Sequence, residues 1–170
     1  MIENLSPKEY NSYYATYIAK VTNSDVVAGL EDSQKEFMEV MQTIPLEKLS
    51  YAYAEGKWTI AEVIQHILDT ERIFGYRALR FARNDKTTLP GYEQDDYVPF
   101  SGANLCSKEE LIADYNAVRV NSIALFRSFS SEMLERLGEA SGSPMSCRAA
   151  GYILSGHQKH HVEVLKERYL

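Results

Sequence analysis

Residues 59–84 read TIAEVIQHILDTERIFGYRALRFARN and carry the clearest helix signal in the chain. Thr59 and Glu62 form a capping box, in which the threonine hydroxyl and the glutamate carboxylate each accept a hydrogen bond from a backbone N–H of the first turn. Apolar residues then recur every three or four positions, as on one face of a helix: Ile60, Val63, Ile64, Ile67, Phe74 and Ala78. We therefore predict an amphipathic helix from Thr59 to about Asn84.

Three other segments carry the signals of a long helix. The first begins near Val26, keeps an approximately helical apolar period and stops at Pro45, which cannot continue a helix. The second begins with a capping box made by Ser107 and Glu110. The third is capped by Ser146 and runs to the C-terminus. With residues 59–84, these segments give four long helices.

Two shorter helical pieces flank them. Ser6, Pro7 and Glu9 combine an N-cap, a proline in the first turn and a capping-box glutamate, so we predict a short helix that runs to about Lys20. Ser131 indicates a short helical extension after the third long helix. No segment shows the strict alternation of polar and apolar residues that is typical of a half-buried strand.

These elements predict an all-α protein, a four-helix bundle that forms one domain over residues 1–170. Residues 85–106 connect the second and third long helices and are far longer than the usual ~2–8 residues of a bundle connection. We expect this segment to cross the bundle. It could cover a functional site, or it could simply be a crossover packed by its own side chains: Tyr92, Glu93, Asp95, Asp96, Tyr97 and Phe100.

The composition excludes several classes of function. Of 170 residues, 18 are Lys or Arg and 24 are Asp or Glu, and the resulting net charge of −6 opposes binding to nucleic acid. No apolar run approaches the ~18 residues of a membrane span, and the first residues lack the basic and apolar regions of a signal peptide. Two cysteines offer at most one disulfide, which a chain of this size does not need. We therefore expect a cytoplasmic protein that binds neither membranes nor nucleic acid.

The histidines are the candidate functional residues. His157 and His161 are four positions apart on the last helix, so both imidazoles can face one metal ion. His66 lies on a flank of its own helix and is the remaining candidate for a third ligand, whereas we expect His160 to be solvated. From spacing alone, a metal site and a pair of partly buried polar histidines are about equally supported. The zinc-peptidase signature His-Glu-x-x-His is not met, because Gln158 follows His157 and cannot act as a general base.

Residues 57–72 and 76–80 resemble the second helix of the DinB/YfiT-like superfamily. Residues 156–161, followed by Arg168 and Tyr169, resemble its last helix. The similarity covers nearly the whole chain, including the tyrosine-rich start and the Leu-Pro-Gly-Tyr sequence in the long loop. It implies a four-helix bundle that holds a divalent metal ion through three histidines, and the matching residues are His66, His157 and His161.

The resemblance also implies a chemistry. Three neutral imidazoles leave a coordination position open, as in catalytic metal sites, and the ion can activate water or a thiol as a nucleophile. Zinc or nickel is the expected ion. Members of this superfamily include metal-dependent hydrolases and enzymes that use a low-molecular-weight thiol, so the expected activity is thiol S-transfer or hydrolysis of a small electrophilic substrate. The alternative is a noncatalytic homodimer that binds metal or a small ligand.

Several other residues have open roles. Asp69, Thr70 and Glu163 could orient the histidine ligands, although each is more often a solvated helix residue. Cys147 is in the first turn of the last helix, where a thiol can be activated, but a packing role is favoured. Trp58 could be a substrate platform, although a hydrophobic staple to Val63 is favoured. A substrate carboxylate could contact one of three arginines, none of which can be assigned from the sequence: Arg72, Arg77 and Arg80.

Overall fold

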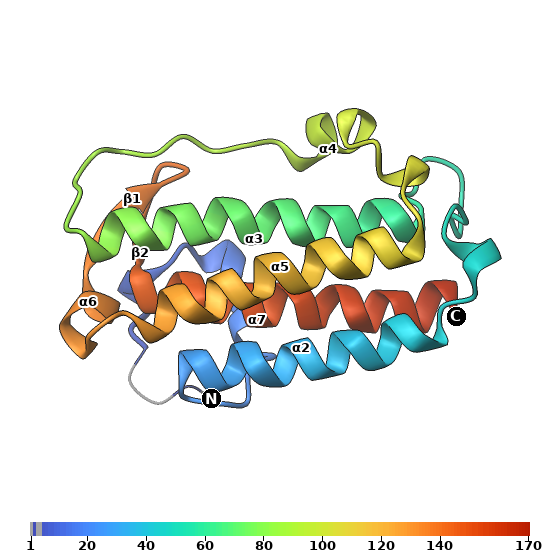
Figure 1. Cartoon of the computed structure of the whole chain (residues 1–170). Coiled ribbons are helices and arrows are strands. Elements are labelled where there is room, and N and C mark those ends of the chain that lie inside the picture. Colours follow the sequence, from blue (N-terminus) through green and yellow to red (C-terminus); the bar gives the residue numbers. More distant parts are fainter. Residues whose placement is uncertain (1, 3–4) are drawn as a thin grey trace.

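The computed structural model describes residues 2 and 5–170, and most of them lie in helices (Figure 1). Four long helices form the body: α2 (Val26–Thr43), α3 (Ile60–Ala82), α5 (Lys108–Arg127) and α7 (Cys147–Val164). A π-helical turn, Leu165–Tyr169, continues α7. The predicted four-helix bundle is therefore confirmed, and so is the short helix α6 (Ser131–Glu135).

The helices begin where their caps predict. Thr59 and Glu62 form both hydrogen bonds of the capping box at the start of α3, and Ser107 and Glu110 do the same for α5. The Ser146 side chain accepts a hydrogen bond from the first turn of α7. These caps satisfy backbone N–H groups that a helix leaves unpaired at its start. Hydrogen bonds within the first turn thus determine where α3, α5 and α7 begin.

The long loop follows from the order of the helices. Figure 1 shows α3 and α5 running in one direction and α2 and α7 in the other. Helix α3 packs against α7, α5 packs against α2, and α3 and α5 also pack against each other. Because α3 and α5 are parallel, the chain must return along the bundle between them. Residues 83–107 make this return and include α4 (Gln94–Tyr97) and two 3-10 turns (Val98–Phe100 and Ala103–Leu105). The predicted crossover is confirmed.

A small hairpin corrects the expectation that the chain has no strands. Strands β1 (Leu137–Ala140) and β2 (Ser143–Ser146) pair antiparallel before α7. Ser141 and Gly142 form the turn, with φ of 54° and 71°, which is the backbone that two-residue hairpins require. A Cβ on Gly138 would lie 1.9 Å from the Phe81 ring, so the glycine lets β1 pack directly on α3. The strands are too short for alternation to reveal them.

The N-terminal segment also differs from the prediction. The capping box of Ser6 forms, but the expected continuous helix is split into two 3-10 turns and one short helix, α1. These pieces are Pro7–Glu9, Ser12–Tyr14 and Ala15–Ile18 (α1). The Asn11 side chain caps the second piece by accepting a hydrogen bond from the Tyr13 backbone, which restarts the helix at that point. Ion pairing between Glu9 and Arg148, at 2.7 Å, holds the first piece against α7.

A buried polar network links the four long helices at the centre of the bundle. The Arg119 guanidinium on α5 is fully buried and donates hydrogen bonds to Glu71 on α3 at 2.7 Å and to Gln158 on α7 at 2.6 Å. It also donates to Ser33 on α2 at 2.6 Å, and Tyr115 donates to the same Gln158 oxygen at 2.7 Å. Buried charges are tolerated when they are paired and hydrogen-bonded in this way. Gln158, the member of the network on α7, directly follows His157, so these hydrogen bonds restrict rotation of α7 about its axis at this position.

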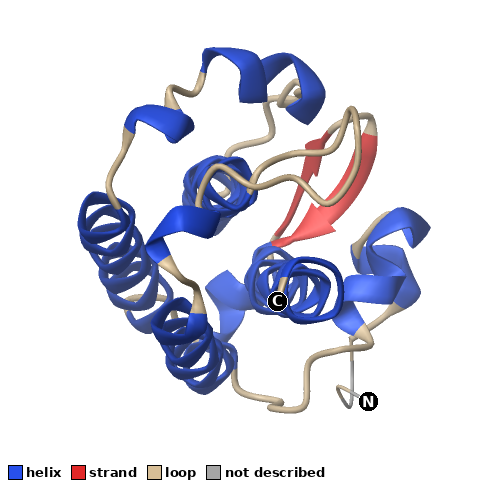
Figure 2. Cartoon of the chain, turned by 90° about the vertical axis from the view of Figure 1, so that its right-hand side faces the viewer, coloured by secondary structure: helices blue, strands red, loops and turns tan. Residues whose placement is uncertain are grey.

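The irregular segments lie outside this helical body. Figure 2 looks along the bundle. The crossover loop passes outside α3, and the hairpin and the N-terminal segment lie next to α3 and α7, away from α2 and α5. None of the described helices is long and apolar enough to cross a membrane.

Candidate metal centre

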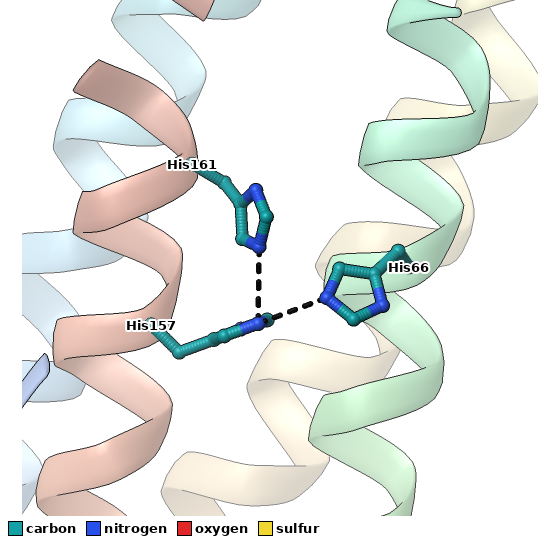
Figure 3. A group of neighbouring side chains, drawn as sticks. All are labelled: His66, His157 and His161. Atoms are coloured by element: carbon teal, nitrogen blue, oxygen red, sulfur yellow. Dashed lines mark hydrogen bonds between the residues drawn. The ribbon is translucent and has the colours of Figure 1, made fainter. Parts of the chain in front are cut away.

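Three imidazole rings converge between α3 and α7 (Figure 3). His157 and His161 extend from successive turns of α7, and His66 faces them from α3. The Nε2 atom of His157 lies 3.0 Å from Nε2 of His66 and 3.1 Å from Nε2 of His161. The three side chains that the sequence singles out are thus brought together, with one potential ligand nitrogen from each directed at a common point.

Aromatic neighbours hold the rings in place. The ring centres of Trp58 and His66 lie 4.8 Å apart, and those of Tyr17 and His157 lie 5.3 Å apart with the two rings nearly perpendicular. Tyr17 reaches this position because its backbone packs directly on Gly156, where a Cβ would lie 2.0 Å from the Tyr17 carbonyl oxygen. Packing of this kind restricts ring rotation and keeps a site preorganised.

The three imidazoles are uncharged at neutral pH. Burial lowers the pKa of His66 to about 4, and the positive charge of His160 adds to this effect. Burial, together with the other histidines, also lowers the pKa of His157 and His161 well below the ordinary value of 6.5. A neutral imidazole carries the lone pair that a metal ion needs. The site is therefore ready to accept a cation without first losing protons.

The geometry suits a divalent metal ion. Nitrogen ligands at ~2.0–2.1 Å from a tetrahedral ion lie ~3.3 Å from one another. The observed contacts of 3.0 and 3.1 Å are close to this spacing, and the ligand atoms of the three histidines all lie within 4.8 Å of one another. Within residues 2 and 5–170, no other group of three potential ligand side chains approaches in this way.

Two cavities adjoin the cluster, one at His157 and one at His161. The first has a volume of about 360 Å³ and is lined by His157, residues of α3 and α7, the N-terminal tyrosines, the crossover loop and the hairpin turn. The second, of about 370 Å³, is lined by His160, His161, Trp58 and the end of α7. Asp95 of α4 lines both cavities. The crossover loop therefore covers the site, as one of its two predicted roles requires.

The proposed orienting residues have other partners. Asp69 accepts hydrogen bonds from Gln65 at 2.9 Å and from Arg72 at 3.4 Å. The Thr70 hydroxyl shares a 2.7 Å hydrogen bond with the Tyr92 hydroxyl, and Glu163 pairs with Lys20. The structure therefore does not support a direct role for these side chains in orienting the histidines. For Asp69 and Glu163 it agrees with the alternative that they are ordinary charged residues on the helix surface.

The structure also gives Cys147, Arg72 and Arg80 roles outside the histidine cluster. Cys147 is fully buried, and burial raises the pKa of its thiol to about 12, which suits packing and not nucleophilic attack. Arg72 forms an ion pair with Asp114 at 2.6 Å, and Arg80 pairs with Asp85 at the end of α3.

His160 differs from its expected environment, whereas the surroundings of Trp58 agree with both roles that the sequence left open. His160 is half buried and packs 5.4 Å from the Tyr17 ring, so the expectation of a solvated side chain is wrong. Trp58 packs on His66 and lines the second cavity together with Val63.

Sequence reasoning missed the two groups that complete the surroundings of the site. Tyr17 was recognised only as part of a tyrosine-rich start, and nothing in its spacing indicates contact with His157. The buried network was also missed, although a signal exists: Arg119 lies four residues after Tyr115 and four before Ile123, on the same buried face of α5. A charged residue on an apolar face indicates a buried partner.

Two curated proteins are similar to the chain in sequence. One is a protein of Oceanobacillus iheyensis named "Putative metal-dependent hydrolase OB0413", which is 25% identical over 153 residues, covering 86% of this chain and 87% of its relative. The other, from Geobacillus thermodenitrificans, has the name "Putative metal-dependent hydrolase" and is 24% identical over 119 residues, or 68% and 66% of the two chains.

Solved structures show the same fold, and the match in sequence shows the family. YfiT from Bacillus subtilis, described as "a probable metal-dependent hydrolase with an unusual four-helix bundle topology", superimposes with a TM-score of 0.71 at 16% identity, covering 96% of this chain and 90% of YfiT. A DinB-like protein of the same organism, YjoA, gives a TM-score of 0.61 at 18% identity, with 83% and 86% covered. Residues 29–165 match the sequence profile of the DinB superfamily, and the chain therefore belongs to that superfamily.

Proposed function

We propose that His66, His157 and His161 bind one divalent metal ion, zinc or nickel, and that the protein is a metal-dependent enzyme acting on a small electrophilic substrate. The observation that carries this proposal is the convergence of three uncharged imidazole nitrogens beside a cavity. An ion held by three neutral ligands keeps its double positive charge and an open coordination position, and it lowers the pKa of a bound water or thiol toward neutrality.

The protein groups around the cluster have defined roles in this proposal. Contact with the Tyr17 ring restricts the rotation of the His157 ring. Burial raises the pKa of Tyr14 and Tyr92, which line the first cavity, so both hydroxyls stay protonated and can donate hydrogen bonds to a substrate. The crossover loop limits access of water to the first cavity. These residues bind and orient a substrate next to the nucleophile.

Hydrolysis and thiol transfer place different demands on the site. The names of the relatives favour hydrolysis, which needs one substrate cavity and a water molecule. The second cavity favours thiol transfer as the alternative activity, because two organic substrates then need space on two sides of the cluster. A low-molecular-weight thiol in one cavity and an electrophile in the other would meet at the histidines.

Metal content tests the first part of the proposal. Protein purified without added metal should contain about one equivalent of zinc or nickel by mass spectrometry, and His157→Ala should lose it. His160→Ala is the matched control, since this histidine lies on the same helix but is not one of the three that converge. Equal metal content in wild type and His157→Ala would refute the assignment.

Activity tests the second part. The metal-loaded protein is assayed against ester and amide substrates, and against model electrophiles with bacillithiol, mycothiol and glutathione. Turnover that is lost in His157→Ala and kept in Glu167→Ala, an exposed position that lines neither cavity, supports the enzyme. Full metal loading without turnover on any of these substrates would favour the noncatalytic alternative, a metal- or ligand-binding protein, and size-exclusion chromatography would then test whether it is a homodimer.

A further inference from the structure

Two arginines are buried in the bundle, and only one has a counter-ion. Arg119 is 0% exposed and is paired with Glu71 at 2.7 Å. Arg77, on α3, is 2% exposed, yet among residues 2 and 5–170 no carboxylate forms an ion pair with it. Its Nη2 atom donates to the Pro90 carbonyl oxygen and to Ser141 Oγ, both at 3.0 Å, while Nη1 is buried without a hydrogen-bond partner. Burying an uncompensated charge is unfavourable, so this position calls for an explanation.

The guanidinium of Arg77 lies at the wall of the first cavity. Ser141, which accepts its hydrogen bond, lines that cavity, as does Gly91, the residue after Pro90. The group also lies 4.9 Å from the ring centre of Phe74, another lining residue. Arg77 therefore places a positive charge directly behind one end of the cavity.

Tyrosine hydroxyls surround the same end. The Tyr14 ring lies 5.7 Å from the Phe74 ring, which the Arg77 guanidinium also contacts, so Tyr14 packs beside this charge. Burial raises the pKa of Tyr14, and the nearby charge of Arg77 opposes this rise. For Tyr92, burial again raises the pKa, and its hydrogen bond to Thr70 and the charge of Arg77 oppose it. Hydroxyl donors in front of a buried positive charge form a suitable environment for an anion.

The hairpin turn contributes a second unusual feature. Ser141 has a φ of 54°, in the left-handed region that favours glycine, and glycine would serve the turn better. With serine at this position, the turn instead presents a hydroxyl to Arg77 and to the cavity. Unfavourable backbone conformations that persist are often found at functional sites.

The same cavity also reaches the histidine cluster. Arg77 follows His66 by 11 residues, which is close to three turns, so both lie on nearly the same face of α3 and about 16 Å apart along its axis. Thr70 and Phe74 lie between them and line the same cavity, which His157 reaches from α7. The lining of the cavity therefore includes both His157, a candidate metal ligand, and Ser141, the hydrogen-bond partner of the buried Arg77.

We propose that the part of the cavity beside Arg77 binds the carboxylate of a small substrate, with Arg77 supplying the charge and the hydroxyls of Tyr14 and Ser141 supplying hydrogen bonds. The proposal rests on the proposed function in one respect: the opposite end of the substrate reacts at the histidines. A carboxylate is favoured over a phosphate because Arg77 offers a single positive charge, and the exposed Glu93 and Asp95 at the same cavity repel a dianion.

Binding of two probes that differ only in charge tests this inference. Hexanoate and hexanol are titrated into the full chain, once metal-loaded and once after dialysis against EDTA, and binding is followed by calorimetry. We expect hexanoate to bind about tenfold more tightly than hexanol. The preference should persist without metal, disappear in Arg77→Met and be partly kept in Arg77→Lys. Inorganic phosphate should bind more weakly than hexanoate.

The outcomes are separable from those of the metal site. Arg77→Met should leave the metal content unchanged, whereas His157→Ala should lose metal and keep the preference for hexanoate. If Arg77→Met does not fold, Ser141→Gly replaces it, because glycine adopts a positive φ freely and removes only the hydroxyl; a reduced preference is then expected. Equal binding of hexanoate and hexanol by wild type, a preference unchanged in Arg77→Met or Ser141→Gly, or tighter binding of phosphate would overturn the inference.

Discussion

Acid should destabilise the metal-free protein through its buried histidines. His66 has a pKa of about 4 in the folded protein, against an ordinary value of 6.5. Because the folded state disfavours the charged imidazole, its contribution to stability is complete above pH 6.5 and is lost as the pH falls toward 4. The difference of about 2.5 pH units corresponds to about 3 kcal/mol at ~1.36 kcal/mol per unit. Lowered pKa values of His157 and His161 act in the same direction.

Urea denaturation of EDTA-dialysed protein measures this effect. The free energy of unfolding is compared at pH 7.5, 5.5 and 4.5 for wild type and for His66→Gln, which has no imidazole to protonate. We expect wild type to lose about 2.5 kcal/mol more than His66→Gln between the highest and lowest pH, because pH 4.5 is still slightly above the folded-state pKa. Added zinc should reduce the loss at pH 5.5, because the ion competes with protons for the same nitrogens. Identical pH dependence in wild type and His66→Gln would show that the cluster is not buried as described.

Three further predictions concern the frame of the site. Arg119→Met leaves the buried Glu71 carboxylate without its counter-ion, so the free energy of unfolding should fall by about 3–5 kcal/mol in urea, and a fall under about 1 kcal/mol would contradict the buried pair. Gly156→Ala sets a Cβ 2.0 Å from a backbone oxygen of the N-terminal segment, so the melting temperature should drop by about 5 °C or more; an unchanged value would mean that the segment packs elsewhere. Cys147 should react with a disulfide reagent far more slowly than Cys106 in the native protein and equally fast in urea, and rapid native modification would rule out its buried position.

The sequence predicted the helices well because their signals are local. The Thr59 and Ser107 capping boxes act within four residues, and each long helix has an apolar face that the core needs. The hairpin was missed because its strands are four residues each and because Gly138 and Pro144 look like breakers in sequence. Its formation depends on contact with Phe81, which lies more than fifty residues earlier in the chain.

The candidate site was predicted unevenly for the same reason. The i, i+4 spacing places His157 and His161 on one helix face, but spacing cannot show which helix lies opposite. His66 entered the prediction as the remaining histidine and through the family resemblance, and its contact with His157 depends on the packing of α3 against α7. The sequence gives no sign that Arg77 lacks a counter-ion, because this depends on every segment that packs around the side chain.

The histidine cluster and the walls of the first cavity are held in place by interactions of different strength. The histidines belong to α3 and α7, which are fixed by the apolar core and by the Arg119 network. Part of the wall of the first cavity comes from irregular segments that are joined by few hydrogen bonds, such as Asn11 to Ser143 at 2.7 Å and the two backbone bonds of Leu89 to the hairpin at 2.9 and 3.1 Å. A bond of this kind contributes only about 1 kcal/mol, so these walls can open locally at a small fraction of the free energy of global unfolding. Local opening of these segments would therefore leave the geometry of the histidines undisturbed.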